Sequence, residues 1–227
     1  MTNEPIVVDF EGFADRRPVL AGVRVGRSFT QTAFTDVEPG IALAARGRRL
    51  ECTAFPEFCA ALIERARREQ RAIAGFSQHE RTRIADGLGG AWPEDVEYID
   101  AKKRAKAWRS ARHPDAAASV GPERQRLRQK GERCRNLGNR LVDFVRLAGD
   151  EVPSGYDDGK VTDTLRRVLG QSDGRRRYRA LTQGTREAWC RVLEHNRLDC
   201  VWARLFIRLG SSRSRGGRAG GKSEASA

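Results

Sequence analysis

The sequence predicts an α/β protein built on a mixed β-sheet. Short strand patterns at the N-terminal end pair as a hairpin, strand and helix patterns then alternate, and the remaining patterns are mostly helical. This order gives a mixed sheet with a leading antiparallel hairpin, flanked by helices. We expect one domain over residues 1–210, with a basic helical insert at about 101–150, and a disordered Gly/Ser/Arg-rich tail over 211–227.

The predicted strands are short and rich in β-branched residues. Five segments fit strands: 5–13, 18–26, 28–34, 72–77 and 96–100. The second and third strands flank Gly26-Arg27, which predicts a hairpin.

Helical periodicity follows in the order that the fold class requires. Six segments fit helices: 55–70, 78–85, 123–135, 137–147, 161–169 and 185–209. Ser77 and Glu80 predict a capping box at the start of the second helix. The small, polar and Pro-containing segment 113–122 predicts a loop.

Charge is distributed unevenly along the chain. The net charge of +13 divides into −3 over residues 1–100, +9 over 101–150 and +7 over 151–227. A basic stretch on a nearly neutral body is typical of proteins that bind polyanions, although a solvated basic surface gives the same counts.

Several classes of protein do not fit the composition. No apolar run approaches the roughly 20 residues of a membrane-spanning helix, and the first residues show no signal-peptide pattern. Five cysteines in such a chain fit thiols in a reducing compartment. We therefore expect a cytoplasmic protein without a membrane partner.

Carboxylates occur at two places where strands end. Asp9 and Glu11 lie two apart in the first strand and so share a face, where a cation between them would relieve their repulsion. An exposed polar strand end is the structural alternative. Glu80 opens the helix after the strand 72–77, and its alternative is the capping box; Asp86 is a fallback acid.

A third acid lies in the middle of the final helix. His195 precedes Asp199 by four residues, so the two share a face, with Asn196 and Trp202 beside them. Asp is a poor residue for a helix interior, which favours a functional role over the alternative of a polar stripe facing solvent.

Together these acids predict a metal site with oxygen ligands. The four candidate ligands are Asp9, Glu11, Glu80 and Asp199. Hard oxygen ligands of high negative charge select Mg²⁺ or Mn²⁺, and a pair of such ions suits in-line displacement at a phosphodiester. His195 is a candidate to deprotonate the attacking water.

The order of these motifs resembles the ribonuclease H-like superfamily. It runs Asp-Phe-Glu on the first strand, a hairpin, a helix, a strand leading into Gly-Phe-Ser-Gln-His-Glu, and a final helix with His-Asn-x-x-Asp. It is most similar to DEDD-type 3′–5′ exonucleases, especially the bacterial predicted nucleases whose last motif reads (Tyr/His)-Asn-x-x-Asp. The likeness covers roughly residues 6–209.

This resemblance implies a fold, a chemistry and a set of roles. The fold would be a ribonuclease H-like mixed sheet, and the activity hydrolysis of single-stranded DNA or RNA from a 3′ end with two Mg²⁺ or Mn²⁺ ions. Asp9 and Glu11 match the first motif, Glu80 the second and Asp199 the third. DNA and RNA both remain open as substrates.

A basic segment with one aromatic residue follows the strand 96–100. It contains Lys102, Lys103, Arg104, Lys106, Trp108 and Arg109. Cations for phosphates and an aromatic for stacking suit a single-strand grip, whereas Trp108 packed on the core is the structural alternative. A second basic run is a candidate channel lining: Arg124, Arg126, Arg128, Lys130, Arg133 and Arg135. The alternative function is a non-catalytic nucleic-acid-binding protein on the same fold with a degenerate metal site.

Overall fold

The computed structural model describes residues 3–13, 17–131, 137–156, 160–172, 175 and 177–211. A six-stranded sheet of order β4-β3-β2-β1-β5-β6 forms its centre. The strands are β1 (Ile6–Gly12), β2 (Pro18–Val25), β3 (Ser28–Phe34), β4 (Glu51–Thr53), β5 (Ile73–Gly75) and β6 (Tyr98–Asp100). The strands β1, β2 and β3 are antiparallel neighbours, while β5 pairs parallel with β1, β6 with β5 and β4 with β3.

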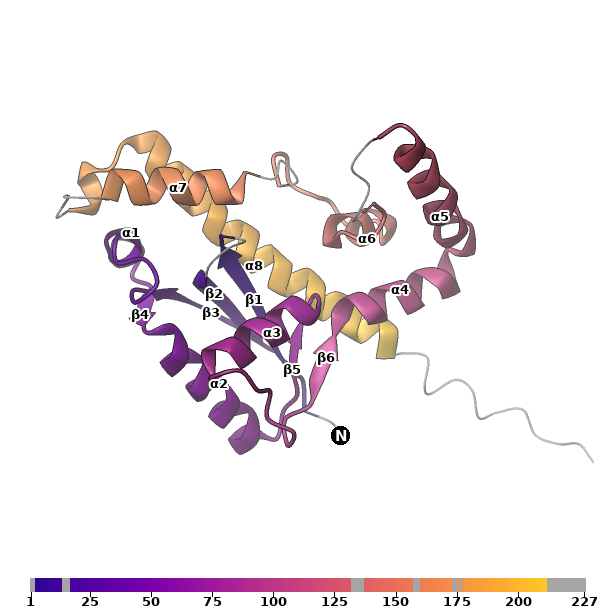
Figure 1. The fold of residues 1–227 in the computed structure, drawn as a ribbon, viewed down its shortest axis with the longest axis horizontal. Coiled ribbons are helices and arrows are strands. Elements are labelled where there is room, and N and C mark those ends of the chain that lie inside the picture. Colours follow the sequence, from indigo (N-terminus) through magenta and orange to yellow (C-terminus); the bar gives the residue numbers. More distant parts are fainter. Residues whose placement is uncertain are drawn as a thin grey trace, which may run out of the picture.

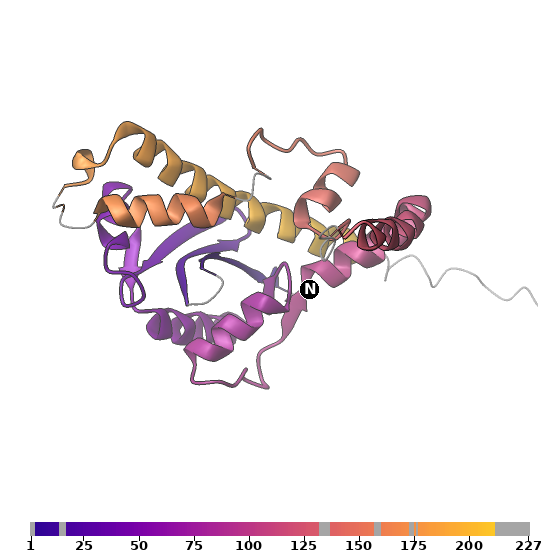
Figure 2. The ribbon, with the colours of Figure 1, turned by 45° about the horizontal axis from the view of Figure 1, so that its top comes forward.

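Helices cover both faces of this sheet (Figure 1). They are α1 (Ile41–Gly47), α2 (Phe55–Glu69), α3 (Gln78–Gly87), α4 (Ala101–Arg112), α5 (Pro114–Gln129), α6 (Leu141–Leu147), α7 (Val161–Ser172) and α8 (Gln183–Ser211). Figure 2 shows α2 and α3 on one side of the sheet and the long helix α8 on the other, with α4 and α5 extending away from the sheet. Among the described helices, none combines the length and apolar character that a membrane span needs.

The alternation of side chains along β1 decides which face carries the acids. Ile6 and Val8 are buried in the core that includes residues of α2 and α3. Val7 points the opposite way and packs with residues of α8. Because side chains on a strand alternate with a period of two, Asp9 and Glu11 share the face of Val7. The two carboxylates therefore lie beneath α8.

The structure confirms the mixed α/β sheet with a leading antiparallel hairpin and flanking helices. The turn between β2 and β3 places Gly26 at φ +58°, a left-handed conformation that glycine adopts without a steric penalty. The predicted capping box is present, with Ser77 as the N-cap of α3.

Other predictions are wrong in detail. The segment 113–122 is not a loop, because α5 begins at Pro114 and continues through Pro122. Proline suits the first turn of a helix, and the alanines that follow are strong helix formers. The helix predicted over 161–169 continues to Ser172, and the one predicted over 137–147 begins only at Leu141.

The short helix α1 and the short strand β4 have no counterpart in the predictions. The seven-residue α1 and the three-residue β4 are too brief for periodicity to reveal them. Part of the remaining predictions lies outside the described residues: Arg133, Arg135 and the tail after Ser211.

Candidate metal centre

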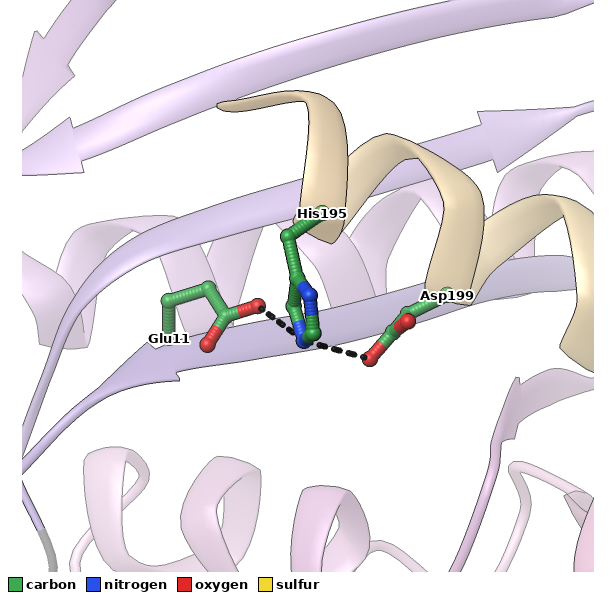
Figure 3. A group of neighbouring side chains, drawn as sticks. All are labelled: Glu11, His195 and Asp199. Carbon is green, nitrogen blue, oxygen red and sulfur yellow. Dashed lines mark ion pairs between the residues drawn. The ribbon is translucent and has the colours of Figure 1, made fainter. Parts of the chain in front are cut away.

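Acidic side chains from β1 and α8 meet around one histidine (Figure 3). His195 Nε2 lies 3.9 Å from Glu11 Oε1 and 3.6 Å from Asp199 Oδ2. One ligand atom from each of these three residues lies within 4.8 Å of the others. The spacing of four residues places His195 and Asp199 on one face of α8, as the sequence predicts, and that face meets the end of β1.

Asp9 is held by the neighbouring residue on α8. The fully buried Asn196 side chain donates from Nδ2 to Asp9 Oδ2 at 2.8 Å and to the Asp9 backbone oxygen at 3.1 Å. Asn196 Oδ1 in turn accepts from Gln31 Nε2 at 3.0 Å, and the same nitrogen donates to the Leu193 backbone oxygen at 2.9 Å. This chain of hydrogen bonds fixes α8 against β1 and β3.

A glycine between these strands makes room for the amide. Gly22 of β2 pairs with Asp9 on one side and with Gln31 on the other. A Cβ atom at Gly22 would lie 2.9 Å from Asn196 Cγ, closer than real Cβ contacts. The absence of a side chain on Gly22 therefore allows Asn196 to reach Asp9.

We expect Gly22→Ala to lower both stability and any metal-dependent activity. The added methyl group displaces the buried amide of Asn196, so Asp9 loses its hydrogen bonds at a cost of about 1–3 kcal/mol. Loss of a group that orients a metal ligand typically lowers activity by roughly 10- to 100-fold. Urea unfolding measures the loss of stability, and metal affinity measures the effect on the metal site. Gly170→Ala, in open space on α7, is the control and should not lower the stability; a Gly22→Ala protein as stable as wild type would contradict the expectation.

Asp199 has a second partner from the segment between α6 and α7. Tyr156 donates its hydroxyl to Asp199 Oδ1. Its ring stacks on His195 with centroids 4.3 Å apart and meets Trp202 edge-on at 4.7 Å. Tyr156 therefore packs against the imidazole while it orients the carboxylate of Asp199.

Glu80 lies in the first turn of α3, where its carboxylate closes the capping box. Its Oε2 accepts from the Ser77 backbone nitrogen at 2.9 Å and from Ser77 Oγ at 3.2 Å. Glu80 is buried and close enough to Asp9 and Glu11 to raise the pKa of both. Glu80 thus closes the capping box and also lies close to the other acids.

Burial dominates the electrostatics of these acids. It raises the pKa of Asp9 and of Glu11 well above their ordinary values, and the charge of Asp199 raises both further. Burial raises the pKa of Asp199 to about 7, against the opposing hydrogen bond from Tyr156. Burial also raises the pKa of Glu80. Burying several carboxylates that repel one another costs free energy, and a bound cation would lower that cost.

One oxygen of this group has no hydrogen bond within the described part of the chain. Glu11 Oε1 is buried and has no hydrogen-bond partner among the described residues. Buried polar atoms are nearly always satisfied, so such an atom calls for an unseen partner. The carboxylate oxygens around it are ligands that Mg²⁺ and Mn²⁺ prefer, and the acids present therefore fit a divalent ion.

The predicted basic segment forms most of α4, and two of its residues pack against other parts of the fold. Trp108 packs on Phe206 with ring centroids 5.5 Å apart. Arg109 donates to the Gly138 backbone oxygen and, at 3.1 Å, to Asn139 Oδ1. These contacts within the fold account for Trp108 and Arg109 without nucleic acid.

The lysines and Arg104 of α4 differ in their surroundings. Lys102 is half-buried, and its pKa is lowered by burial and by the neighbouring charges of Lys106 and Arg124, while Glu80 acts to raise it. Lys103 and Arg104 are exposed. Lys102 therefore lies near enough to Glu80 for the two charges to interact.

Comparisons with known proteins give no relative. No protein-family model matches the chain, and no curated protein or solved structure shows a significant match. The function therefore rests on the sequence and on the geometry of the site.

Sequence patterns left out some residues that build the site. Tyr156 lies in a segment without periodicity, 43 residues before Asp199, so no local pattern connects the two. Gln31 fits an ordinary polar position of an alternating strand, and Gly22 an ordinary small residue of a strand. The available signal was the group of His195, Asn196 and Asp199 in the final helix, which indicated that α8 contacts polar groups there.

Proposed function

We propose that this protein is a metal-dependent nuclease of the ribonuclease H-like type, acting as a 3′–5′ exonuclease on single-stranded DNA or RNA. The observation that carries the proposal is the buried Glu11 Oε1, which has no hydrogen bond among the described residues and lies beside His195 and Asp199, among carboxyls whose pKa values are raised by burial. The direction of the exonuclease activity comes from the resemblance of the motifs.

The side chains of the site have distinct tasks in this proposal. Asp9, Glu11 and Asp199 would hold two Mg²⁺ or Mn²⁺ ions, with Glu80 as the fourth acid, and the ions would stabilise the attacking and leaving oxygens of the phosphodiester. Asn196 and Tyr156 orient the carboxylates of Asp9 and Asp199, respectively.

His195 is the group placed to accept a proton. Its Nε2 faces the acids, and the ring is kept in place by stacking on Tyr156. As water attacks phosphorus, one of its protons passes to Nε2, the bond to the leaving oxygen breaks, and solvent protonates that oxygen. The strand arrangement also supports the proposal, since the first acids lie on the central strand β1 and the last on the helix that covers it.

Nucleic acid would be held beside the acids by cations of α4 and α5. Lys102 and Lys106 are one helical turn apart, and Arg124 of α5 lies near enough to lower the pKa of Lys102. Cations that crowd one another in this way gain from an anion placed among them. A phosphate of the substrate strand is such an anion.

The double variant K102Q/K106Q should bind single-stranded oligonucleotides more weakly and with less dependence on salt. Each phosphate contact on a single strand contributes about 0.7 to the slope of log affinity against log salt, so the slope should fall by about 1.4. Fluorescence anisotropy in EDTA measures the slope. R46Q/R68Q removes two exposed charges from α1 and α2, outside the proposed grip, and is the matched control. If both double variants shift the slope equally, the cations of α4 act only through net charge.

The proposed function is tested by incubating the purified full chain with end-labelled single-stranded DNA and RNA. With Mn²⁺ we expect stepwise shortening from the 3′ end, and with EDTA no cleavage. Strands that stay intact with Mn²⁺ would overturn the proposal. Binding without cleavage would instead establish the non-catalytic nucleic-acid-binding alternative.

A further inference from the structure

Tyr98 of β6 lies against the first turn of α3, the turn that carries Glu80. Its hydroxyl donates to the backbone oxygen of Ser77, the N-cap of that helix. The backbone nitrogen and Oγ of Ser77 in turn donate to Glu80 Oε2, at 2.9 and 3.2 Å. Ser77 therefore connects the phenol of Tyr98 to the carboxylate of Glu80.

The backbone at Gly75 shows how closely Tyr98 and Glu80 approach one another. A Cβ atom at this position of β5 would lie 2.5 Å from the Tyr98 hydroxyl oxygen and 2.8 Å from both Cβ and Cγ of Glu80. The two side chains thus pack together in the space that a side chain at position 75 would take. The charge of Glu80, after burial, also raises the pKa of Tyr98, which agrees with this proximity.

Packing holds the ring of Tyr98 in this place. Trp92 meets it edge-on with ring centroids 5.3 Å apart, and Trp92 Nε1 donates to the Val96 backbone oxygen at 2.7 Å. The guanidinium of Arg81, on α3, lies 5.5 Å from the centre of the Trp92 ring. These contacts join β6 and the segment before it to the start of α3.

The carboxylate of Glu80 is held at one oxygen. Both hydrogen bonds that it accepts from described residues are on Oε2, which leaves Oε1 for a cation. The charge of Glu80 raises the pKa of Asp9, Glu11 and Asp199, so the carboxylate lies near enough to interact with all three. A group that fixes the carboxylate of Glu80 would therefore affect a cation bound among these acids.

We propose that Tyr98 is a positioning residue of the metal centre, which holds Ser77 so that the carboxylate of Glu80 stays in place to bind a divalent ion. This role rests on the proposed function, because it requires Glu80 to be a ligand of the ions that the nuclease uses. A Tyr98 with a purely structural role would stabilise the start of α3 and leave metal binding unchanged.

The variant Y98F removes only the hydroxyl, and Mn²⁺ binding by the full chain measures the effect. Electron paramagnetic resonance of free Mn²⁺, recorded without nucleic acid, should show an affinity roughly 10- to 100-fold below that of wild type. Y178F is the matched control and should bind Mn²⁺ as wild type does. Tyr178 is also half-buried, but it packs on the core formed with residues of α1, α7 and α8.

The double variant E80Q/Y98F tests whether Tyr98 acts through Glu80. E80Q alone should weaken Mn²⁺ binding, and the double variant should bind Mn²⁺ as E80Q does, because two residues that act as one unit are not additive. Additive losses, wild-type affinity in E80Q, or wild-type affinity in Y98F each overturn the positioning role. Lower stability of Y98F in urea, with unchanged Mn²⁺ affinity, overturns it as well.

These outcomes separate the role of Tyr98 from the proposed function. Wild-type Mn²⁺ affinity in Y98F overturns the role even if the protein cleaves nucleic acid with Mn²⁺. The expected loss in Y98F, in a protein that binds Mn²⁺ and cleaves no nucleic acid, supports the role and overturns the nuclease. A wild-type chain that does not bind Mn²⁺ overturns both.

Discussion

Asp9→Asn should abolish Mn²⁺-dependent cleavage and at the same time raise the stability of the metal-free protein. The asparagine keeps an oxygen that can accept from Asn196, so the local structure is retained while the charge is lost. A metal ion contributes several kcal/mol to such a reaction, so loss of a ligand should lower the rate by about a thousandfold or more.

The gain in stability follows from burial. At neutral pH, folding the wild type either keeps a carboxylate among other buried acids or forces Asp9 to take up a proton. Both cost free energy, and Asn avoids them, so we expect a gain of about 1–3 kcal/mol in urea unfolding with EDTA.

Asp86→Asn is the matched control for this experiment. Asp86 lies in the last turn of α3, half-exposed and 3.9 Å from Arg83, so its neutralisation should change neither cleavage nor stability appreciably. A D9N protein that still cleaves with Mn²⁺, at a rate like that of D86N, would remove Asp9 from the chemistry.

In the absence of metal, the protein should lose stability as the pH rises from about 4 to about 7. Burial raises the folded-state pKa of Asp199 from 3.8 to about 7, and it raises the pKa of Asp9, Glu11 and Glu80 as well. A carboxyl group whose pKa is raised by folding contributes its full stabilisation below its unfolded-state pKa. That contribution is lost as the pH rises through its folded-state pKa. The loss should reach on the order of a few kcal/mol.

Excess Mn²⁺ should reverse most of this loss, because the ion binds the folded state and favours ionised ligands. Thermal unfolding at about pH 5 and about pH 8, with Mn²⁺ or EDTA, measures the effect. The shift in Tm caused by Mn²⁺ should be larger at the higher pH in the wild type and small at both values in D199N. An equal shift in both proteins would mean that the metal binds elsewhere.

The sequence carried enough information for the main framework of this fold. The strands β1, β2 and β3, and the long helix α8, each repeat a period often enough to be identified. The same periods place Asp9 with Glu11 on one face and His195 with Asp199 on another. The periods alone do not show that these two faces meet. That contact depends on α8 packing on the sheet, and the order of the motifs predicted it.

The remaining parts of the site depend on contacts between distant segments. Tyr156 reaches Asp199 from an irregular segment, and Gly22 matters only because Asn196 lies over it. Local periodicity does not predict such pairs, since it indicates which way a side chain faces and not which residue it contacts.

The contact between Gly22 and Asn196 also limits how this protein can change over evolutionary time. A larger residue at position 22 and an amide at position 196 exclude one another. A lineage that acquires a methyl group on β2 must shorten the residue at 196 and find a new donor for Asp9. Substitutions at these two positions should therefore appear together in descendants of this chain, and a single change at either should be rare.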